Sequence, residues 1–371
     1  MSLITEPTFD ALNQGDDALR IGVVAPPWYC IPPKGYGGTE AVVAAVVDQL
    51  VARGHHVTLV ASGEPGTAAQ RYIQVYEQPP SELLGHDVMP ELVNAAEAHA
   101  ALADLALDVI HDNSAAGPLS APARRCPTVV TTHGPVTGPN GDYYRRLGAT
   151  VELVAISEAQ RRQAPDLHWA GMVHNAIDVA SFPYKPDKAD YLLWVGRFCP
   201  DKAPDLAIEV ARRSGRPIVL AGKLNDQRER EYFETVVKPL LGPGVDYVGE
   251  ADTKLKRELY AKAAALVFPI QWEEPFGMVM AEALACGTPV VATPRGSVPE
   301  IVRPGVNGFI ACDVAGLVDA VQRLDEISPA VCRADAQARF DLPVMAEGYE
   351  RVFRRVVGEG GSVAKRLITA A

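Results

Sequence analysis

Short apolar runs alternate with longer helical patterns along almost the whole chain, and this alternation limits the folds that 371 residues can adopt. The runs are rich in Val, Ile, Leu and Ala, as expected for strands buried on both faces, and such alternation is typical of βαβ units that form parallel sheets. Helices are predicted at residues 39–53 and 91–105. The strands predicted in the first half are residues 20–25, 57–61, 108–111, 128–132, 151–156 and 171–174.

The alternation breaks at a polar, proline-containing stretch, residues 182–188, and then restarts. We therefore expect an α/β protein with two Rossmann-like domains, residues 1–180 and 181–341, and a final helix at about 342–360 that packs back on the first domain. The carboxyl ends of both sheets should face a cleft where ligands bind. The strands predicted in the second half are residues 191–195, 217–221, 245–248, 265–269, 289–292 and 308–310.

Composition excludes several classes of function. The formal charge is −11 and no long basic run occurs, which argues against a nucleic-acid partner. The six cysteines are scattered without a C-x-x-C pair, so we expect reduced thiols in a cytoplasmic protein and no zinc site. The polar start, residues 1–19, does not resemble a signal peptide, and no apolar run is long enough for a membrane span. Membrane association is not expected, because no basic amphipathic helix is evident.

A glycine-rich segment, residues 35–40, lies between the first strand and its helix and reads Gly-Tyr-Gly-Gly-Thr-Glu. Glycines at a helix N-terminus let a phosphate approach the free backbone amides. The spacing is neither the G-x-G-x-x-G fingerprint of dinucleotide binding nor a Walker A loop. Gly37 and Gly38 are therefore candidates for a phosphate-binding loop, with a plain connecting loop as the alternative.

The second half opens with two cations, Arg197 and Lys202, that follow a strand ending at Gly196. A guanidinium can hold phosphate through a planar fork, and an ammonium group acts as a point charge. Two cations that converge on a diphosphate could stabilise it as a leaving group without a metal. The alternative is that both are ordinary surface cations.

The segment Glu274-Pro275-Phe276-Gly277, with Glu282 eight positions after Glu274, is the strongest motif. Because Pro275 suits the first turn of a helix, we expect Glu274 at the helix start and Glu282 about two turns in. The free amides of that first turn should then point into the cleft, with one carboxylate near a sugar and the other near a ribose. Negative charge near a helix start is also common without any such function.

His133 follows the predicted strand 128–132 in a Thr-His-Gly sequence. A lone histidine is often structural, but a place at the carboxyl end of a strand favours a role in a binding site. Ser157, Asn175 and Asp178 also lie at strand ends, and no specific role is assigned to them.

Together and in this order, the four motifs resemble those of the GT-B-fold glycosyltransferases of family 4, and the resemblance covers nearly the whole chain. The amino-acid sequences of the motifs look closest to those of the avilamycin-type antibiotic enzymes. The resemblance implies a metal-independent, retaining hexosyltransferase without a cofactor, which uses a UDP- or GDP-sugar and a hydroxyl acceptor. The family usually has glycine after the lysine, whereas this chain has Ala203, which implies a different entry into the helix. A UDP-sugar 2-epimerase and a non-catalytic nucleotide-sugar-binding module remain as alternatives.

The resemblance also implies roles for individual residues. Arg197 and Lys202 would neutralise the diphosphate, and Gly37 and Gly38 would lie near it or near the acceptor. His133 would contact the sugar near its reacting carbon. The remaining donor-binding positions implied by the family are Val248, Glu274, Phe276, Gly277, Met278, Val279 and Glu282.

Overall fold

The computed structural model of the chain describes residues 17–35, 37–224 and 226–369, with side chains as far as residue 359, so Tyr36 of the glycine-rich segment lies outside it. It contains a seven-stranded sheet in the order β3-β2-β1-β4-β5-β6-β7 and a six-stranded sheet in the order β10-β9-β8-β11-β12-β13. Every pair of neighbouring strands is parallel. The predicted pair of parallel α/β sheets is therefore confirmed.

Most strands are buried along their length, which explains why they appear as continuous apolar runs. The edge strands β3, β7 and β10 are only partly buried, and sequence analysis missed β3, whose sequence is the polar Arg-Tyr-Ile-Gln. The strands are β1 (Arg20–Val24), β2 (His56–Ala61), β3 (Arg71–Gln74), β4 (Val109–Asp112), β5 (Thr128–Thr132), β6 (Glu152–Ala155), β7 (Trp169–Met172), β8 (Leu192–Val195), β9 (Ile218–Ala221), β10 (Val245–Tyr247), β11 (Ala265–Phe268), β12 (Val290–Ala292) and β13 (Gly308–Ile310).

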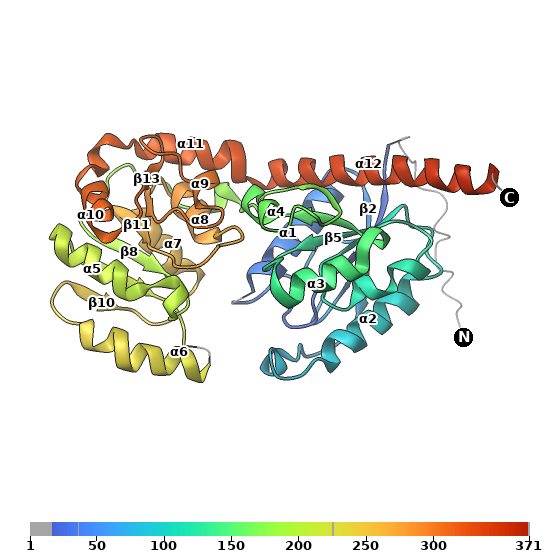
Figure 1. Cartoon of the computed structure of the whole chain (residues 1–371), viewed down its shortest axis with the longest axis horizontal. Coiled ribbons are helices and arrows are strands. Elements are labelled where there is room, and N and C mark those ends of the chain that lie inside the picture. Colours follow the sequence, from blue (N-terminus) through green and yellow to red (C-terminus); the bar gives the residue numbers. More distant parts are fainter. Residues whose placement is uncertain (1–16, 36, 225, 370–371) are drawn as a thin grey trace, which may run out of the picture.

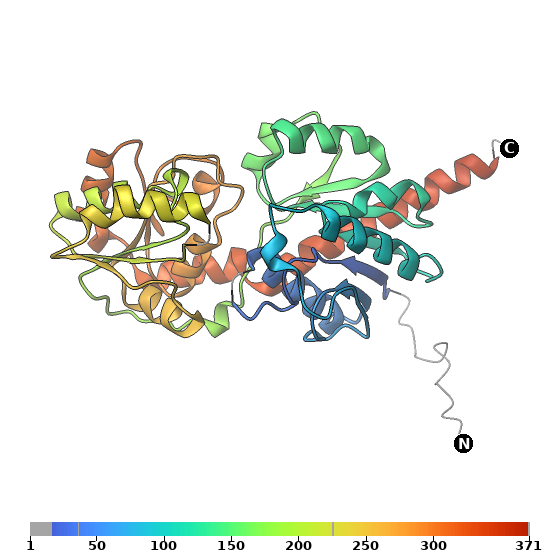
Figure 2. The same cartoon turned by 90° about the horizontal axis from the view of Figure 1, so that it is seen from below.

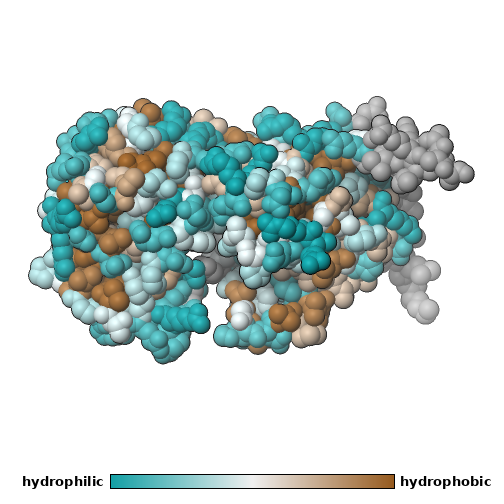
Figure 3. Space-filling view, viewed as in Figure 1, coloured by the Kyte–Doolittle hydropathy of each residue, from teal (hydrophilic) through white to brown (hydrophobic). Residues whose placement is uncertain are grey.

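Helices connect the strands and cover the sheets, and the two sheets form separate bodies that lie side by side (Figure 1). The space-filling surface is notched between them (Figure 3). The helices are α1 (Gly38–Ala52), α2 (Met89–Leu102), α3 (Gly138–Leu147), α4 (Glu158–Gln163), α5 (Pro204–Ser214), α6 (Gln227–Tyr232), α7 (Thr253–Lys262), α8 (Met278–Ala285), α9 (Val298–Ile301), α10 (Val314–Gln322), α11 (Pro329–Phe340) and α12 (Leu342–Thr369). None of these helices, within the described part of the chain, is long and apolar enough to cross a membrane.

The final helix, α12, leaves the second body and runs along the first (Figures 1 and 2). Its apolar face joins the core of the first sheet, and its Tyr349 hydroxyl lies 3.0 Å from Thr131 Oγ1. Thr131 Oγ1 in turn lies 2.8 Å from Nε2 of the buried His111 on β4. The chain therefore crosses between the bodies twice, once near residue 180 and once at α12. The division into domains at residues 180 and 341 stays a prediction.

A polar contact also joins the two bodies. Glu300, on α9 of the second body, accepts the backbone N–H groups of Glu158 and Ala159 at the start of α4 in the first body. The same carboxylate lies 3.2 Å from His174 Nε2. Burial disfavours the ionised form of Glu300, but these hydrogen bonds outweigh it, so its pKa lies below the usual range.

Candidate active site

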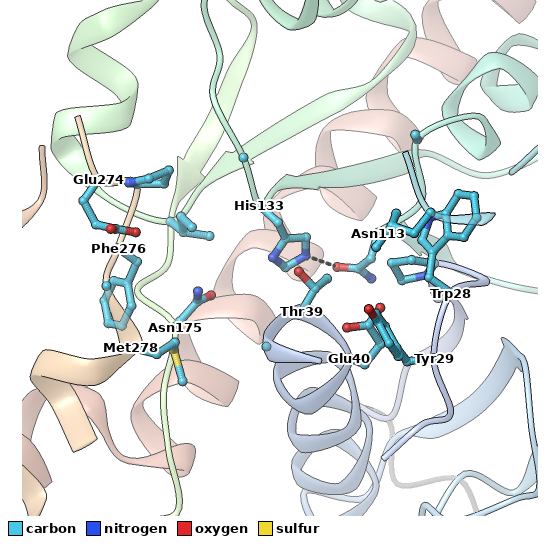
Figure 4. Close-up of a pocket in the computed structure, with 18 of the residues that line it drawn as sticks. Trp28, Tyr29, Thr39, Glu40, Asn113, His133, Asn175, Glu274, Phe276 and Met278 are labelled. Atoms are coloured by element: carbon cyan, nitrogen blue, oxygen red, sulfur yellow. Dashed lines mark hydrogen bonds between the residues drawn. The ribbon is translucent and has the colours of Figure 1, made fainter. Parts of the chain in front are cut away.

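A cavity of about 510 Å³ lies between the two bodies and is lined by residues of both. The first body contributes the loop after β1, the start of α1, the start of α2 and the segments after β4, β5, β6 and β7. The second body contributes residues 272 and 274–278, which precede or begin α8. Figure 4 shows Glu274, Phe276 and Met278 on one side of this space, with His133 between them and the aromatic and acidic side chains on the other. A cavity therefore lies between the two sheets, where the cleft was predicted.

The loop that carries Glu274 is held by backbone contacts with the segment before α9. Ser297 N donates to the Glu274 carbonyl at 2.9 Å, and Ser297 Oγ donates to the Phe276 carbonyl at 2.6 Å. Gly296 has a positive φ of 53°, and a Cβ there would lie 2.2 Å from the Glu274 carbonyl oxygen. Only glycine allows so close an approach of two backbones. The position of Glu274 thus depends on a segment more than twenty residues away in the chain.

Glu274 is buried and forms an ion pair with Lys202. The same carboxylate oxygen accepts the Trp272 indole N–H at 3.0 Å. The Lys202 ammonium lies 4.8 Å from the centroid of the Trp272 ring, close enough for a cation–π interaction. The two motifs that contain Lys202 and Glu274 therefore meet at one point beside the cavity.

The expected start of the helix after Glu274 is wrong. The helix α8 begins at Met278, with Gly277 as its N-cap at φ 79°, so Pro275 lies in the preceding loop rather than in the first turn. The left-handed conformation of Gly277 ends the loop, and Ser297 holds the carbonyl of Phe276 outside the helix. Glu282 is consequently about one turn inside α8 and not two.

Glu282 is buried, but it lies behind the cavity rather than in its lining. Its carboxylate accepts a hydrogen bond from Lys256 Nζ on α7 at 2.8 Å. Its charge also adds to the effect of burial in raising the pKa of the buried Tyr260 hydroxyl. Of the other predicted donor-binding residues, Val248 is 41% exposed and Val279 half-buried, and neither lines this cavity.

Arg197 and Lys202 do not meet in this structure. Arg197 is half-exposed and lines a second cavity of about 520 Å³, where its Nη1 lies 3.4 Å from the carboxylate of the buried Glu229. Lys202 lies instead against Glu274. The two cavities are neighbours, because both are lined by Tyr29 and Leu84. The convergence of both cations on one group stays a prediction.

The glycine-rich segment leads into α1 beside the cavity. Gly37 caps α1 with a φ of 146°, and a Cβ there would lie 2.8 Å from Pro33 and 3.1 Å from a carboxylate oxygen of Glu40. Gly38 is the first residue of α1 and lines the cavity. A larger residue at 37 would therefore displace both the loop and Glu40.

His133 lies at the end of β5 in the cavity wall, with its Nε2 2.9 Å from Asn113 Oδ1 (Figure 4). Loss of hydration lowers its pKa to about 4, so the ring is neutral at pH 7. With this orientation of the Asn113 amide, Nε2 carries the proton and Nδ1 is left as an acceptor. His133 can therefore accept a hydrogen bond from a ligand without adding positive charge.

Several cavity residues received no role from the sequence. Sequence analysis noted Glu40 only as the last residue of the glycine-rich segment, and Asn175 only as a residue at the end of a strand. Glu91 and Trp28 gave no signal, because they lie more than sixty residues apart and meet only in the fold, where the Trp28 indole donates to Glu91 Oε1 at 2.8 Å. Such pairs show no local pattern.

Comparison with known families gives two adjoining matches. The model of Glycosyltransferase Family 4 matches residues 36–181, and the model of Glycosyl transferases group 1 matches residues 180–338. A phosphatidyl-myo-inositol mannosyltransferase of Mycobacterium leprae is 25% identical over 93% of this chain and 99% of the relative. A D-inositol 3-phosphate glycosyltransferase of Mycolicibacterium smegmatis is 30% identical over 50% of this chain and 48% of the relative.

Solved structures agree with these matches. AviGT4, a glycosyltransferase involved in avilamycin A biosynthesis, is 25% identical with a TM-score of 0.69 over 92% of this chain and 98% of its own. Anabaena Alr3699/HepE in complex with UDP and glucose is 18% identical with a TM-score of 0.69 over 91% of this chain and 99% of its own, and shares the fold. The predicted GT-B architecture is confirmed.

Proposed function

Because this chain belongs to glycosyltransferase family 4, we propose that it is a retaining hexosyltransferase that moves a sugar from a UDP- or GDP-sugar to a hydroxyl group of an acceptor. The observation that carries the proposal is the cavity between the two sheets, in which the Glu274 loop of one body faces His133 of the other. Similarity to a protein that has been crystallised with UDP and glucose supports a nucleotide-sugar donor.

The proposed donor site lies on the second body. Glu274 and the amides of the loop and first turn of α8, residues 276–279, would bind the sugar hydroxyls, because a carboxylate and N–H groups together match hydroxyls as donors and acceptors. Glu282 would bind the ribose and Val248 would lie beside the base. For these two contacts to form, the nucleotide part of the donor would have to extend beyond the cavity between the bodies, in the direction of α7 and β10.

The proposed chemistry stabilises a departing diphosphate. The bond between the anomeric carbon and the diphosphate oxygen breaks, the acceptor oxygen attacks from the same face, and the acceptor proton passes to the leaving diphosphate. Lys202 and Arg197 would neutralise the charge that develops on that group, with help from the dipole of α8. In this proposal the cations perform the role that a metal ion plays in other transferases.

Neutral His133 would lie on the acceptor side of the sugar. Its free Nδ1 could accept a hydrogen bond from a sugar hydroxyl near the reacting carbon. A neutral ring suits that position better than a charged one, because an imidazolium would oppose the positive charge of an oxocarbenium-like transition state.

A two-stage experiment tests the proposed function. Thermal-shift measurements with UDP, GDP, ADP and dTDP should show a rise in Tm for the matching nucleotide, since a ligand that binds only the folded state stabilises it. Release of that nucleotide should then follow addition of its sugar conjugate and an acceptor. Conversion of the donor without any acceptor would point to an epimerase, and binding without release would point to a binding module.

A further inference from the structure

The acceptor side of the cavity is acidic. Glu40 of α1 and Glu91 of α2 both line it, and their residues are only 5% and 9% exposed. Burial raises the pKa of the Glu40 carboxyl, and the neighbouring charge of Glu91 adds to this shift. Burial also raises the pKa of Glu91, although hydrogen bonds from Ala115 and Ala116 work against it. Among the described residues that line this cavity there is no Lys or Arg.

The two carboxylates differ in the hydrogen bonds that they accept from the protein. One oxygen of Glu91 accepts the Trp28 indole N–H at 2.8 Å, and the other accepts the backbone N–H groups of Ala115 and Ala116 at 2.9 and 3.3 Å. Glu40, by contrast, has no hydrogen-bond partner on another residue within the described part of the chain, and only its own backbone N–H favours its ionised form. The Glu91 carboxylate therefore has a structural role in the cavity wall, whereas the Glu40 carboxylate can accept hydrogen bonds from a ligand.

A second acceptor in the same space also lacks a partner. Asn175 is 6% exposed, and its Oδ1 is buried without a hydrogen-bond donor among the residues that the structure describes. Its amide points toward the space between His133 and Met278 (Figure 4). Buried polar atoms nearly always find a partner, so an unpaired one in a binding cavity indicates a group that a ligand supplies. Glu40, Asn175 and the free Nδ1 of His133 all require hydrogen-bond donors.

From this arrangement we propose that the acceptor is a hydroxyl-rich compound that is uncharged or carries an amino group, without phosphate or carboxylate on the part that enters the cavity. The proposal rests on the proposed function, because it assigns the acceptor to that cavity. Hydroxyl and ammonium groups donate hydrogen bonds to Glu40 and Asn175. An anionic group would meet two buried carboxylates, with no lysine or arginine among the described lining residues, which lowers affinity by about tenfold or more. The rings of Trp28 and Tyr29 add faces that attract a sugar ring or an ammonium group.

The test is an acceptor panel made of matched pairs, with release of UDP or GDP from the donor sugar as the readout. Each pair joins a neutral or amino compound to its anionic form, for example methyl glucoside and glucose 6-phosphate, myo-inositol and its 1-phosphate, or glucosamine and its 6-phosphate. We expect the accepted compounds to be non-anionic, and phosphate to lower kcat/KM by about tenfold or more. Preference for the anionic member overturns the proposal, as does failure of every non-anionic compound while slow hydrolysis of the donor proceeds.

A variant links this selectivity to Glu40. Glu40→Gln should reduce the effect of the phosphate on kcat/KM by about tenfold within each pair, with hydrolysis of the donor by water measured alongside to report any loss of donor binding. Glu97→Gln, the same change on the exposed face of α2, is the matched control and should leave this effect unchanged. If phosphate lowers kcat/KM as much in Glu40→Gln as in the wild-type protein, the proposed role of Glu40 in acceptor selection is overturned. Absence of both donor binding and donor hydrolysis in the wild-type protein refutes the proposed function, and the acceptor proposal with it.

Discussion

The Lys202 ammonium and the Glu274 carboxylate form an ion pair that joins the 3-10 turn Pro200–Lys202 to the loop before α8. Their side chains are 15% and 10% exposed, so the pair is largely shielded from water. Each group therefore holds the other in place, and a charge left alone at this point would be costly. A donor that takes up either group has to replace this interaction with one of its own.

Lys202→Ala should lower kcat by about 10²–10³, because the variant loses a cation that stabilises the leaving diphosphate. It should also lose up to about 3–5 kcal/mol of stability, since Glu274 is left buried without its counter-ion. The protein should still fold, so kcat is measured well below Tm and circular dichroism checks the secondary structure. Lys262→Ala, on the half-exposed side of α7, is the control. Turnover close to wild type in Lys202→Ala contradicts the role of this residue.

Gly296→Ala should impair donor binding without touching the cavity. The added Cβ would lie 2.2 Å from the Glu274 carbonyl oxygen and 2.3 Å from its backbone nitrogen, so the loop must move. We expect KM for the donor to rise by about tenfold, since a small misplacement of binding groups is costly. Gly305→Ala is the matched control, because Gly305 also has a positive φ, of 76°, but a Cβ there meets nothing within 4 Å. Equal donor KM values in the two variants would show that backbone strain alone explains the effect.

Stability should depend on pH through Glu300. Its folded-state pKa is lowered, so it contributes stability above the usual glutamate pKa of about 4.3, and this contribution is lost as pH falls through the folded-state value. Glu300→Gln should therefore have a lower Tm than wild type at pH 7, and the difference should shrink below about pH 4.3. Tm measured from pH 7 to 3.5 checks this, with the exposed Glu347→Gln as control. A Tm difference between Glu300→Gln and wild type that stays constant from pH 7 to 3.5 would rule out the ionised Glu300 carboxylate as the source of this stability.

His133 should remain neutral across the physiological range. With a pKa lowered to about 4 by burial, its ring does not take up a proton near pH 6.5, whereas it does so in the unfolded chain. Between these values the unfolded state binds more protons, so this residue makes stability rise with pH. NMR of ring-labelled histidine, with His133→Asn to assign the signal, should show no titration of His133 between pH 5.5 and 8. A midpoint near 6.5 would contradict its burial in the cavity wall.

The alternation of apolar runs and helical patterns was enough to predict two parallel sheets. Most of their strands are buried and largely apolar and so show a strong local signal, whereas the edge strand β3 is partly exposed and shows none. The motifs at the ends of strands could also be placed near one cleft, because the carboxyl ends of parallel strands share an edge of the sheet. Glu274 belongs to the other sheet, so its place at the same cleft also depended on the expectation that the two sheets face each other.

Local sequence rules failed where a distant segment decides the conformation. Pro275 favours a helix start, but the contact of Ser297 with the Phe276 carbonyl keeps this stretch outside α8. Ala203 stands where a glycine was expected, yet it adopts φ 46° and ψ 55° at the cap of α5, the left-handed conformation that glycine favours. Ala203 is buried, and its local sequence gave no sign that an alanine would adopt this conformation.

Fold class, family and the order of the motifs could be predicted without a structure, because these depend on local hydrophobicity and on residues close together in the chain. Tertiary structure alone decided that Lys202 pairs with Glu274 while Arg197 pairs with Glu229. It also decided that Glu40, Glu91 and Asn175 share a cavity without a lysine or arginine among its described lining residues. Charges and hydrogen-bond partners act over a few ångströms in space, and the fold brings together residues that the sequence keeps far apart.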